Sequence, residues 1–87
     1  MEGNHAIIIG ADDWEGLFVN GKLVEEGHTL NEGYSRRKYL LSICMKYNLK
    51  MDEILEGYVT DDYDEVLADQ GGFDENIEDV GFYLDEV

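Results

Sequence analysis

Every lysine and arginine of the chain lies in its first 50 residues, and this uneven distribution of charge limits how the chain can fold. Residues 1–50 carry seven acidic and six basic side chains, whereas residues 51–87 carry fourteen acidic side chains and no basic one. Like charges repel one another and destabilise a compact state. The fold must therefore keep the acidic side chains of the second half on its surface, without cationic partners from the same half.

The acidic half is still expected to fold, because apolar residues are interspersed among its carboxylates. These residues are Ile54, Leu55, Tyr58, Val66, Leu67, Phe73, Ile77, Val80 and Phe82. The whole chain of 87 residues is 44% hydrophobic, which is enough for a modest core and argues against disorder. A chain of this length has room for one core, so we expect a single compact domain over residues 1–87.

The sequence contains no apolar segment long enough for a membrane protein and no cysteine pair that would indicate an oxidising compartment. Its longest apolar run, Ala6 to Ile9, is much shorter than the roughly 20 residues that a membrane-spanning helix needs. The single Cys44 cannot form a disulfide within the chain, and it lies in an apolar stretch where a thiol behaves as a small hydrophobe. We therefore expect a soluble protein of the reducing cytoplasm.

The first half of the chain predicts a strand followed by a hairpin. The apolar run from His5 to Ile9, ending at Gly10, indicates a buried strand. In the segment from Leu17 to Val24, two β-prone runs flank Asn20-Gly21, the pair that best tolerates the two positive φ angles of a type I′ turn. Residues 12–16 between these pieces are expected to be a connection anchored by the only tryptophan.

A helix is expected from Leu30 to Tyr47. Thr29 and Glu32 have the spacing of a capping box at its start. An alternative start at Ser35 would place three basic residues in the first turn, against the helix dipole, so the earlier start is preferred. The expected apolar face consists of Leu30, Tyr34, Leu41, Cys44, Met45 and Asn48, with Leu40 and Tyr47 beside them.

The second half predicts a strand, a short acidic helix and a further apolar segment. Asp52 to Val59 is ambiguous between helix and strand, with a strand packed against the hairpin favoured. Thr60 is expected to cap a helix from Asp61 to about Gln70, which Gly71-Gly72 ends. Phe73 to Val80 fits a turn or one helical turn, and Phe82 to Leu84 a terminal strand or an apolar tail.

These elements predict an α+β fold. It has a small antiparallel sheet with an N-terminal strand and hairpin, one main helix packed on it, and a second short acidic helix beside the main helix.

Catalysis and metal binding are not expected. The only histidines are His5 and His28, and the only serines are Ser35 and Ser42, so the chain offers few groups for an acid–base or nucleophilic site. The two histidines and Cys44 are scattered without the spacing of metal ligands. The acidic run that begins at Asp61 lacks the glycine and the final glutamate of a calcium loop. We therefore predict that the protein is not an enzyme and has no metal or cofactor.

The acidic second half is the main candidate for binding a partner. Fourteen carboxylates match the charge of roughly 24 Å of duplex DNA, which carries about one charge per 1.7 Å, and a domain of this length is about 25–30 Å across. A net charge of −15 argues against direct binding of nucleic acid. The predicted partner-binding residues are Asp61, Asp62, Asp64, Glu65, Asp69, Asp74, Glu75, Glu78 and Asp79.

Two smaller features offer alternatives. Trp14, flanked by acidic residues, is a secondary interface candidate because tryptophan is enriched at binding hot spots, although the only tryptophan of a small domain is more often part of its core. Arg36, Arg37 and Lys38 form the only basic cluster, whose simplest role is to balance nearby acids.

Three segments carry a resemblance. Gly10 to Val24, Glu26 to His28, and Gly72 to Val80 together resemble small uncharacterised proteins encoded by bacteriophages, over about a third of the chain. The resemblance implies a phage context and assigns no functional residue. In composition alone, the chain is similar to acidic phage inhibitors of host enzymes, such as anti-restriction proteins, uracil-DNA glycosylase inhibitors and some anti-CRISPR proteins.

Three functional hypotheses follow. The leading one is a phage-encoded inhibitor that binds the basic nucleic-acid-binding surface of a host defence or DNA-processing protein by acidic mimicry. The second is a phage accessory protein that binds a host factor through the hairpin and Trp14. The third is a sponge for a small anionic signalling molecule, held by the basic cluster. The identity of the partner and the oligomeric state stay open.

Overall fold

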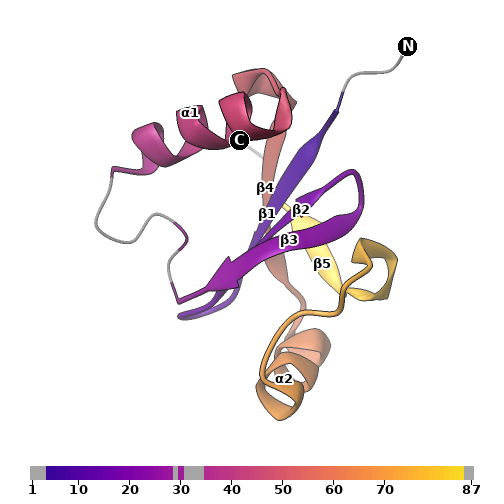
Figure 1. Cartoon of the computed structure of the whole chain (residues 1–87). Helices are drawn as coiled ribbons and strands as arrows, with labels where there is room; N and C mark the ends of the chain where they lie inside the picture. The colour runs from indigo at the N-terminus through magenta and orange to yellow at the C-terminus, as the bar shows by residue number, and fades with distance from the viewer. Residues whose placement is uncertain (1–3, 29, 31–34, 86–87) are drawn as a thin grey trace.

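The structure is a computed structural model that describes residues 4–28, 30 and 35–85, and these residues form one five-stranded mixed sheet (Figure 1). The strands are β1 (Ala6–Gly10), β2 (Glu15–Val19), β3 (Lys22–Gly27), β4 (Ile54–Val59) and β5 (Phe82–Leu84). Their order across the sheet is β3-β2-β1-β4-β5. β1 and β4 are parallel, and the other neighbouring pairs are antiparallel. The predicted α+β fold is confirmed, and the parallel pair is the part of the sheet that was not foreseen.

The central strand β1 has apolar side chains on both of its faces. Ala6 and Ile8 pack in a core with helix α1 (Arg36–Tyr47), whereas Ile9 packs in a second core with helix α2 (Asp61–Gln70). Side chains alternate between the two faces of a strand, so a continuous apolar run is the pattern of a strand that is covered on both sides. The buried strand predicted from His5 to Ile9 is confirmed.

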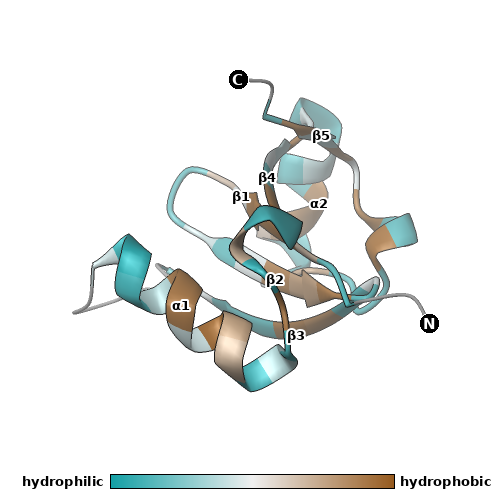
Figure 2. Cartoon of the chain, turned by 90° about the horizontal axis from the view of Figure 1, so that it is seen from above, coloured by the Kyte–Doolittle hydropathy of each residue, from teal (hydrophilic) through white to brown (hydrophobic). Residues whose placement is uncertain are grey.

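The two helices lie on opposite sides of the sheet, as Figure 2 shows. The core on the α2 side includes Phe18 of β2 together with Tyr63 and Leu67 of α2. Contrary to the expectation from the sequence, the shorter helix therefore does not lie beside the main one. The reason is that β1 and β2 present apolar residues to both faces, and each face needs its own cover.

The predicted hairpin is confirmed, although β2 begins at Glu15, inside the segment 12–16 that was expected to be a connection. Asn20 and Gly21 join β2 to β3 with φ angles of 52° and 85°. Two successive positive φ angles are the backbone signature of a type I′ turn. The register shifts between Leu17 and Phe18, where β2 and β3 depart from regular pairing.

Helix α1 starts at the later of the two positions that the sequence offered. It begins at Arg36, and the Ser35 hydroxyl accepts a hydrogen bond from the Lys38 backbone N–H at 3.1 Å, which makes Ser35 the N-cap. The preferred start at Leu30 is therefore wrong. The capping box expected from Thr29 and Glu32 lies outside the described part of the chain. Carboxylates from the sheet offset the unfavourable position of Arg36 in the first turn, as shown below.

The apolar face of α1 was predicted only in part. Its buried residues are Tyr39 and Ile43, whereas Leu41 is 46% exposed and Met45 is 87% exposed. Leu40, Cys44 and Tyr47 pack around the buried pair as expected. Two apolar stripes compete on this helix, and only contact with the sheet decides between them.

The second half of the chain follows the local predictions closely. A short 3₁₀ helix (Met51–Glu53) leads into β4, so the ambiguous segment is mostly strand. β4 lies beside β1 and β5 and does not touch the hairpin strands in the sheet, because β1 lies between. The Thr60 hydroxyl accepts a hydrogen bond from the Tyr63 N–H at the start of α2, and Gly71, with φ of 76°, ends the helix.

The chain after α2 crosses the same face of the sheet before it forms β5. Phe73 packs against Phe18 with ring centroids 5.7 Å apart, and a second 3₁₀ turn (Ile77–Asp79) follows. Asn76 makes an isolated bridge with Lys22 at the start of β3. Among the described residues, neither helix is long and apolar enough to cross a membrane.

Candidate functional site

The outer face of α2 carries five acidic side chains, all of them exposed. They are Asp61, Asp62, Asp64, Glu65 and Asp69. Successive residues of an α-helix are turned by about 100°, so four of the five carboxylates lie opposite the buried Tyr63 and Leu67, and Asp64 lies at the flank of the helix nearest Leu67. Asp61, Asp62 and Asp64 lie in the first turn, where the helix dipole favours negative charge. The local sequence thus both starts the helix and turns its carboxylates to solvent.

The loop between β1 and β2 adds two acidic residues to this surface. A groove of about 370 Å³ lies between the loop and α2, and it is lined by Asp12, Asp13 and Trp14 from the loop and by Asp64 and Leu67 from the helix, among others. Because β1 and β4 are parallel, the loop that follows β1 and the helix that follows β4 leave the sheet at the same end of the strands. The loop and the helix therefore lie next to each other. Sequence reasoning missed Asp12 and Asp13 because this pairing spans distant parts of the chain.

A second hollow of about 360 Å³ adjoins the groove and combines acids with aromatic rings. It is lined by Gly10, Ala11, Asp12, Tyr58, Val59, Asp61, Asp64 and Tyr83. Tyr58 and Tyr83 are paired across β4 and β5, and their ring centroids are 5.9 Å apart. Both rings are about half exposed, at 47% and 57%. We call this hollow the tyrosine recess. Neither tyrosine was among the predicted site residues.

Trp14 has one side in the core and one side in the groove. The side chain is half-buried and packs against the α2-side core. Its indole N–H donates to the Glu26 carboxylate at 3.0 Å, and its ring meets the His28 ring edge-on at 5.0 Å. The core role and the interface role considered for this residue are therefore both compatible with its position.

The other predicted partner-binding residues lie after α2 and do not line either hollow. Asp74 is half-buried, and its carboxylate accepts a hydrogen bond from the Tyr63 hydroxyl at 2.9 Å. Glu75, Glu78 and Asp79 lie on the segment next to the start of β3, where Lys22 donates to the Asn76 side chain. The predicted set is thus divided between α2 and a separate acidic segment that also holds the fold together.

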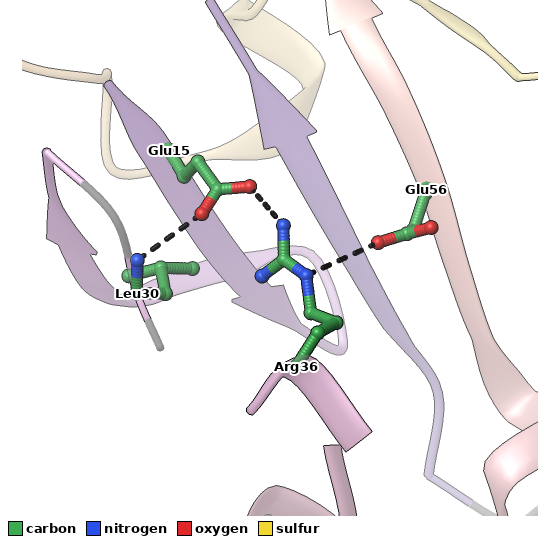
Figure 3. Close-up of polar contacts among 4 residues, drawn as sticks. All are labelled: Glu15, Leu30, Arg36 and Glu56. Atoms are coloured by element: carbon green, nitrogen blue, oxygen red, sulfur yellow. Dashed lines mark hydrogen bonds and ion pairs between the residues drawn. The ribbon is translucent and has the colours of Figure 1, made fainter. Parts of the chain in front are cut away.

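Arg36, the first residue of the basic cluster, is engaged away from the acidic groove. Arg36 is paired with Glu15 of β2, and its Nε lies 3.9 Å from the Glu56 carboxylate of β4 (Figure 3). Glu15 also accepts a hydrogen bond from the Leu30 N–H at 3.1 Å. Burial lowers the pKa of the Arg36 guanidinium, but the hydrogen bond and charge of Glu15, together with Glu56 and Tyr39, outweigh this effect and raise the pKa. The expectation that the basic cluster balances nearby acids holds for Arg36.

The described residues contain no cluster of three or more histidine, cysteine, aspartate or glutamate side chains that could hold a metal ion. Burial raises the pKa of the Cys44 thiol, and Glu53 adds to this, so the thiol form is favoured over the nucleophilic thiolate. What the site offers chemically is a dense array of carboxylates with aromatic surface at one end. Such an array can bind cations and cationic side chains.

The fold and the site define a small α+β domain with an acidic surface. No protein-family model, curated protein or solved structure matches the chain.

Proposed function

We propose that this protein is a phage-encoded inhibitor that binds the basic nucleic-acid-binding surface of a host defence or DNA-processing protein. The observation that carries the proposal is the charge density of α2. Five carboxylates lie on ten residues, a length of about 15 Å at the usual helical rise. This is about one charge per 3 Å, close to the charge per 3.4 Å along one DNA strand.

The dimensions of the molecule suit the same role. Its principal extents are 34 × 33 × 25 Å, so one face can cover the width of a groove that normally holds a short piece of duplex. The carboxylates of α2 stand on a capped helix whose inner face is fixed in a core. A preorganised array loses little conformational freedom on binding, and its field steers a basic partner toward it.

The distribution of cations supports binding to a basic partner. Among the residues that line the groove or the tyrosine recess there is no lysine or arginine. The carboxylates there keep their charge available for an incoming cation. Such a partner occurs inside an infected bacterium, so the proposal places the protein in the host cytoplasm and assigns it no catalytic step.

One competing function rests on a specific observation. Trp14 and the groove beside it could hold an apolar side chain of a host factor, with the acids serving only solubility. The anionic-ligand hypothesis loses support, because Arg36 is paired with Glu15 and Glu56. Arg37 and Lys38 are exposed and line neither the groove nor the tyrosine recess.

The experiment that tests the proposal is capture followed by competition. The immobilised protein is exposed to a bacterial lysate, and the captured protein is then purified and titrated with duplex DNA. We expect DNA to displace the captured protein and the affinity to fall steeply with salt, because both ligands use the same cations. The variant with Asp61, Asp62, Asp64, Glu65 and Asp69 changed to Asn or Gln should bind at least about fivefold more weakly, since exposed pairs contribute about 0.2–1 kcal/mol each.

Two controls make the result specific. Asp52→Asn with Asp85→Asn removes exposed charges that do not line the groove, and it should leave binding nearly unchanged. Trp14→Ala should weaken binding less than the α2 variant does. Binding that occurs together with DNA, survives neutralisation of α2 and is lost in Trp14→Ala would overturn mimicry and support the accessory-protein function.

A further inference from the structure

The tyrosine recess has a lining that a general acidic surface lacks. Tyr58 and Tyr83 pair across two strands and leave about half of each ring open to solvent. Exposed aromatic rings at the edge of a hollow are typical of interaction sites, because their burial in a complex releases much apolar area. The pair is not needed by either hydrophobic core, since neither ring belongs to one.

The position of the rings follows from the sheet. Tyr58 lies in register with Gly10 of β1, whose missing side chain leaves room beside the ring. Gly10 and Ala11, at the end of β1, line the recess together with Asp12. The start of α2 adds Asp61 and Asp64 to the lining. Three chain segments therefore surround one hollow with two rings and three carboxylates.

This combination selects the chemistry of an occupant. The carboxylates exclude anions, and the rings favour a group that is both cationic and able to stack. The guanidinium of arginine is planar, stacks on aromatic faces and pairs with carboxylates through two parallel hydrogen bonds, whereas the lysine ammonium is a compact and strongly hydrated charge. The hollow is also large enough, at about 360 Å³, for one such side chain.

The protein's own arginine does not fill this role. Arg36 lines a neighbouring hollow together with Gly10, Ala11 and Tyr58. Its charge is directed to Glu15 and Glu56, and it does not line the tyrosine recess.

We infer that the tyrosine recess receives a single arginine side chain of the basic partner, with its guanidinium against Tyr58 and Tyr83 and its charge opposite Asp12, Asp61 and Asp64. This inference rests on the proposed function and adds a fixed anchoring point to it. The carboxylates of α2 would attract the partner, and the recess would set its orientation.

The test uses small probes and the intact protein. Acetyl-arginine methylamide, its lysine counterpart and the neutral citrulline counterpart are titrated into labelled protein, and backbone amide shifts are followed by NMR. We expect saturable shifts with the arginine probe that concentrate at Gly10 to Asp12 and Tyr58 to Asp64, weaker binding of the lysine probe and none of the citrulline probe. Shifts spread evenly over all acidic segments, or equal affinity for arginine and lysine, would overturn the inference.

Variants separate the recess from the overall charge. Tyr83→Leu keeps an apolar side chain in β5 and should raise the Kd of the arginine probe about two- to fivefold. Asp61→Asn with Asp64→Asn should raise it about threefold or more, whereas the charge-matched Asp52→Asn with Asp85→Asn should not change it. Circular dichroism and melting curves establish that each variant is folded. An unchanged Kd in folded Tyr83→Leu would reject the rings as part of the site.

The captured partner distinguishes failure of this inference from failure of the proposed function. If DNA displaces the partner but Tyr83→Leu and the Asp61, Asp64 variant bind it as tightly as the natural sequence, the recess is not the anchor and the mimicry proposal stands. If the recess variants bind the partner weakly while DNA and the protein bind it simultaneously, the mimicry proposal fails and the recess is retained as a site.

Discussion

A single hydroxyl group ties α2 to the segment that follows it. The Tyr63 hydroxyl donates to the Asp74 carboxylate at 2.9 Å and accepts from the Asp74 N–H at 2.9 Å and from the Gln70 amide at 3.3 Å. Asp74 is therefore used inside the molecule, although the sequence marked it as part of a binding surface. An acidic residue beside a buried tyrosine cannot be told from a solvated one without knowing the tertiary contact.

Buried tyrosines make the stability sensitive to alkaline pH. Burial raises the pKa of both Tyr39 and Tyr63 above the ordinary value, and Glu25 adds to the effect at Tyr39. The unfolded chain ionises its tyrosines near pH 10. The contribution of the two buried tyrosines to the free energy of unfolding is therefore complete below about pH 10. It is lost as the pH rises through the higher pKa values that these tyrosines have in the folded state.

We expect the melting temperature to fall as the pH is raised above about 10. Tyrosinate absorbance, followed together with circular dichroism, should show ionisation of the buried tyrosines coinciding with unfolding. Tyr63→Phe should reduce the alkaline loss of stability. A melting temperature that is constant between about pH 9 and 11 would contradict this account.

Gly21 is a position where the backbone requires glycine. Its φ of 85° is costly for any residue with a Cβ, while the added Cβ would meet only Ile77, at 3.5 Å. Gly21→Ala should therefore destabilise the protein by about 1–2 kcal/mol, and thermal denaturation should show a fall of about 4–8 °C per kcal/mol. Gly27→Ala is the matched control, because a Cβ added there would have no atom within 4 Å and the φ angle is not positive. Equal melting temperatures for the two variants would refute the positive-φ turn.

Among the elements, α2 begins at a capping side chain that also joins the helix to another part of the chain. The Thr60 hydroxyl accepts from the Tyr63 N–H at 3.3 Å, and the Thr60 backbone N–H donates to the Gly81 carbonyl at 2.9 Å, which joins the helix start to the chain before β5.

Thr60→Ala should cost about 1 kcal/mol through the lost cap, whereas Thr60→Ser should retain most of the stability. The comparison is made by chemical denaturation of the three proteins. If alanine and serine variants were equally stable, the hydroxyl would not be the capping group.

The elements that were predicted correctly are those with local signals. The turn at Asn20-Gly21 and the helix start at Thr60 depend only on neighbouring residues, so both could be predicted from the sequence. The start of α1 depends instead on Arg36 reaching Glu15, which is 21 positions away. The buried face of that helix likewise depends on which stripe meets the sheet. The cap at Ser35 was visible in the sequence as an alternative, but the choice between the two starts and between the two apolar stripes is made by tertiary contacts.

At the scale of the whole molecule, repulsion among like charges is the main electrostatic term. The net charge is −15, and the ion pairs among the described residues involve only Arg36 and Lys46 as cations. Added salt screens repulsion between exposed charges more than it weakens these few pairs.

We therefore expect the melting temperature to rise as salt increases from low to moderate concentration. The variant with the five α2 carboxylates neutralised should show a smaller rise, because it has less repulsion to screen. Differential scanning calorimetry across a salt series measures both. A melting temperature that falls with salt would mean that specific ion pairs dominate.

The candidate site, like the fold, could be predicted from the sequence only where it depends on neighbouring residues. The acids of α2 follow from helical spacing, since five of ten residues are acidic and the buried residues are apolar. Asp12 and Tyr83 join them only because β1, β4 and β5 are neighbours in the sheet. Strand order depends on contacts between distant residues, so it could not be read from local patterns.

The central place of β1 also determines how different parts of the protein open. Its backbone is paired with β2 on one side and with β4 on the other, while β3 and β5 lie at the edges. Amide hydrogens of the central strand can exchange with deuterium only when the sheet itself separates, whereas those of an edge strand exchange after local fraying. Hydrogen-exchange mass spectrometry should therefore find Ile7 to Ile9 among the slowest amides and β5 among the fastest of the strands. The tyrosine recess is therefore lined both by Gly10, on the strand expected to exchange most slowly, and by Tyr83, on one of the strands expected to exchange fastest.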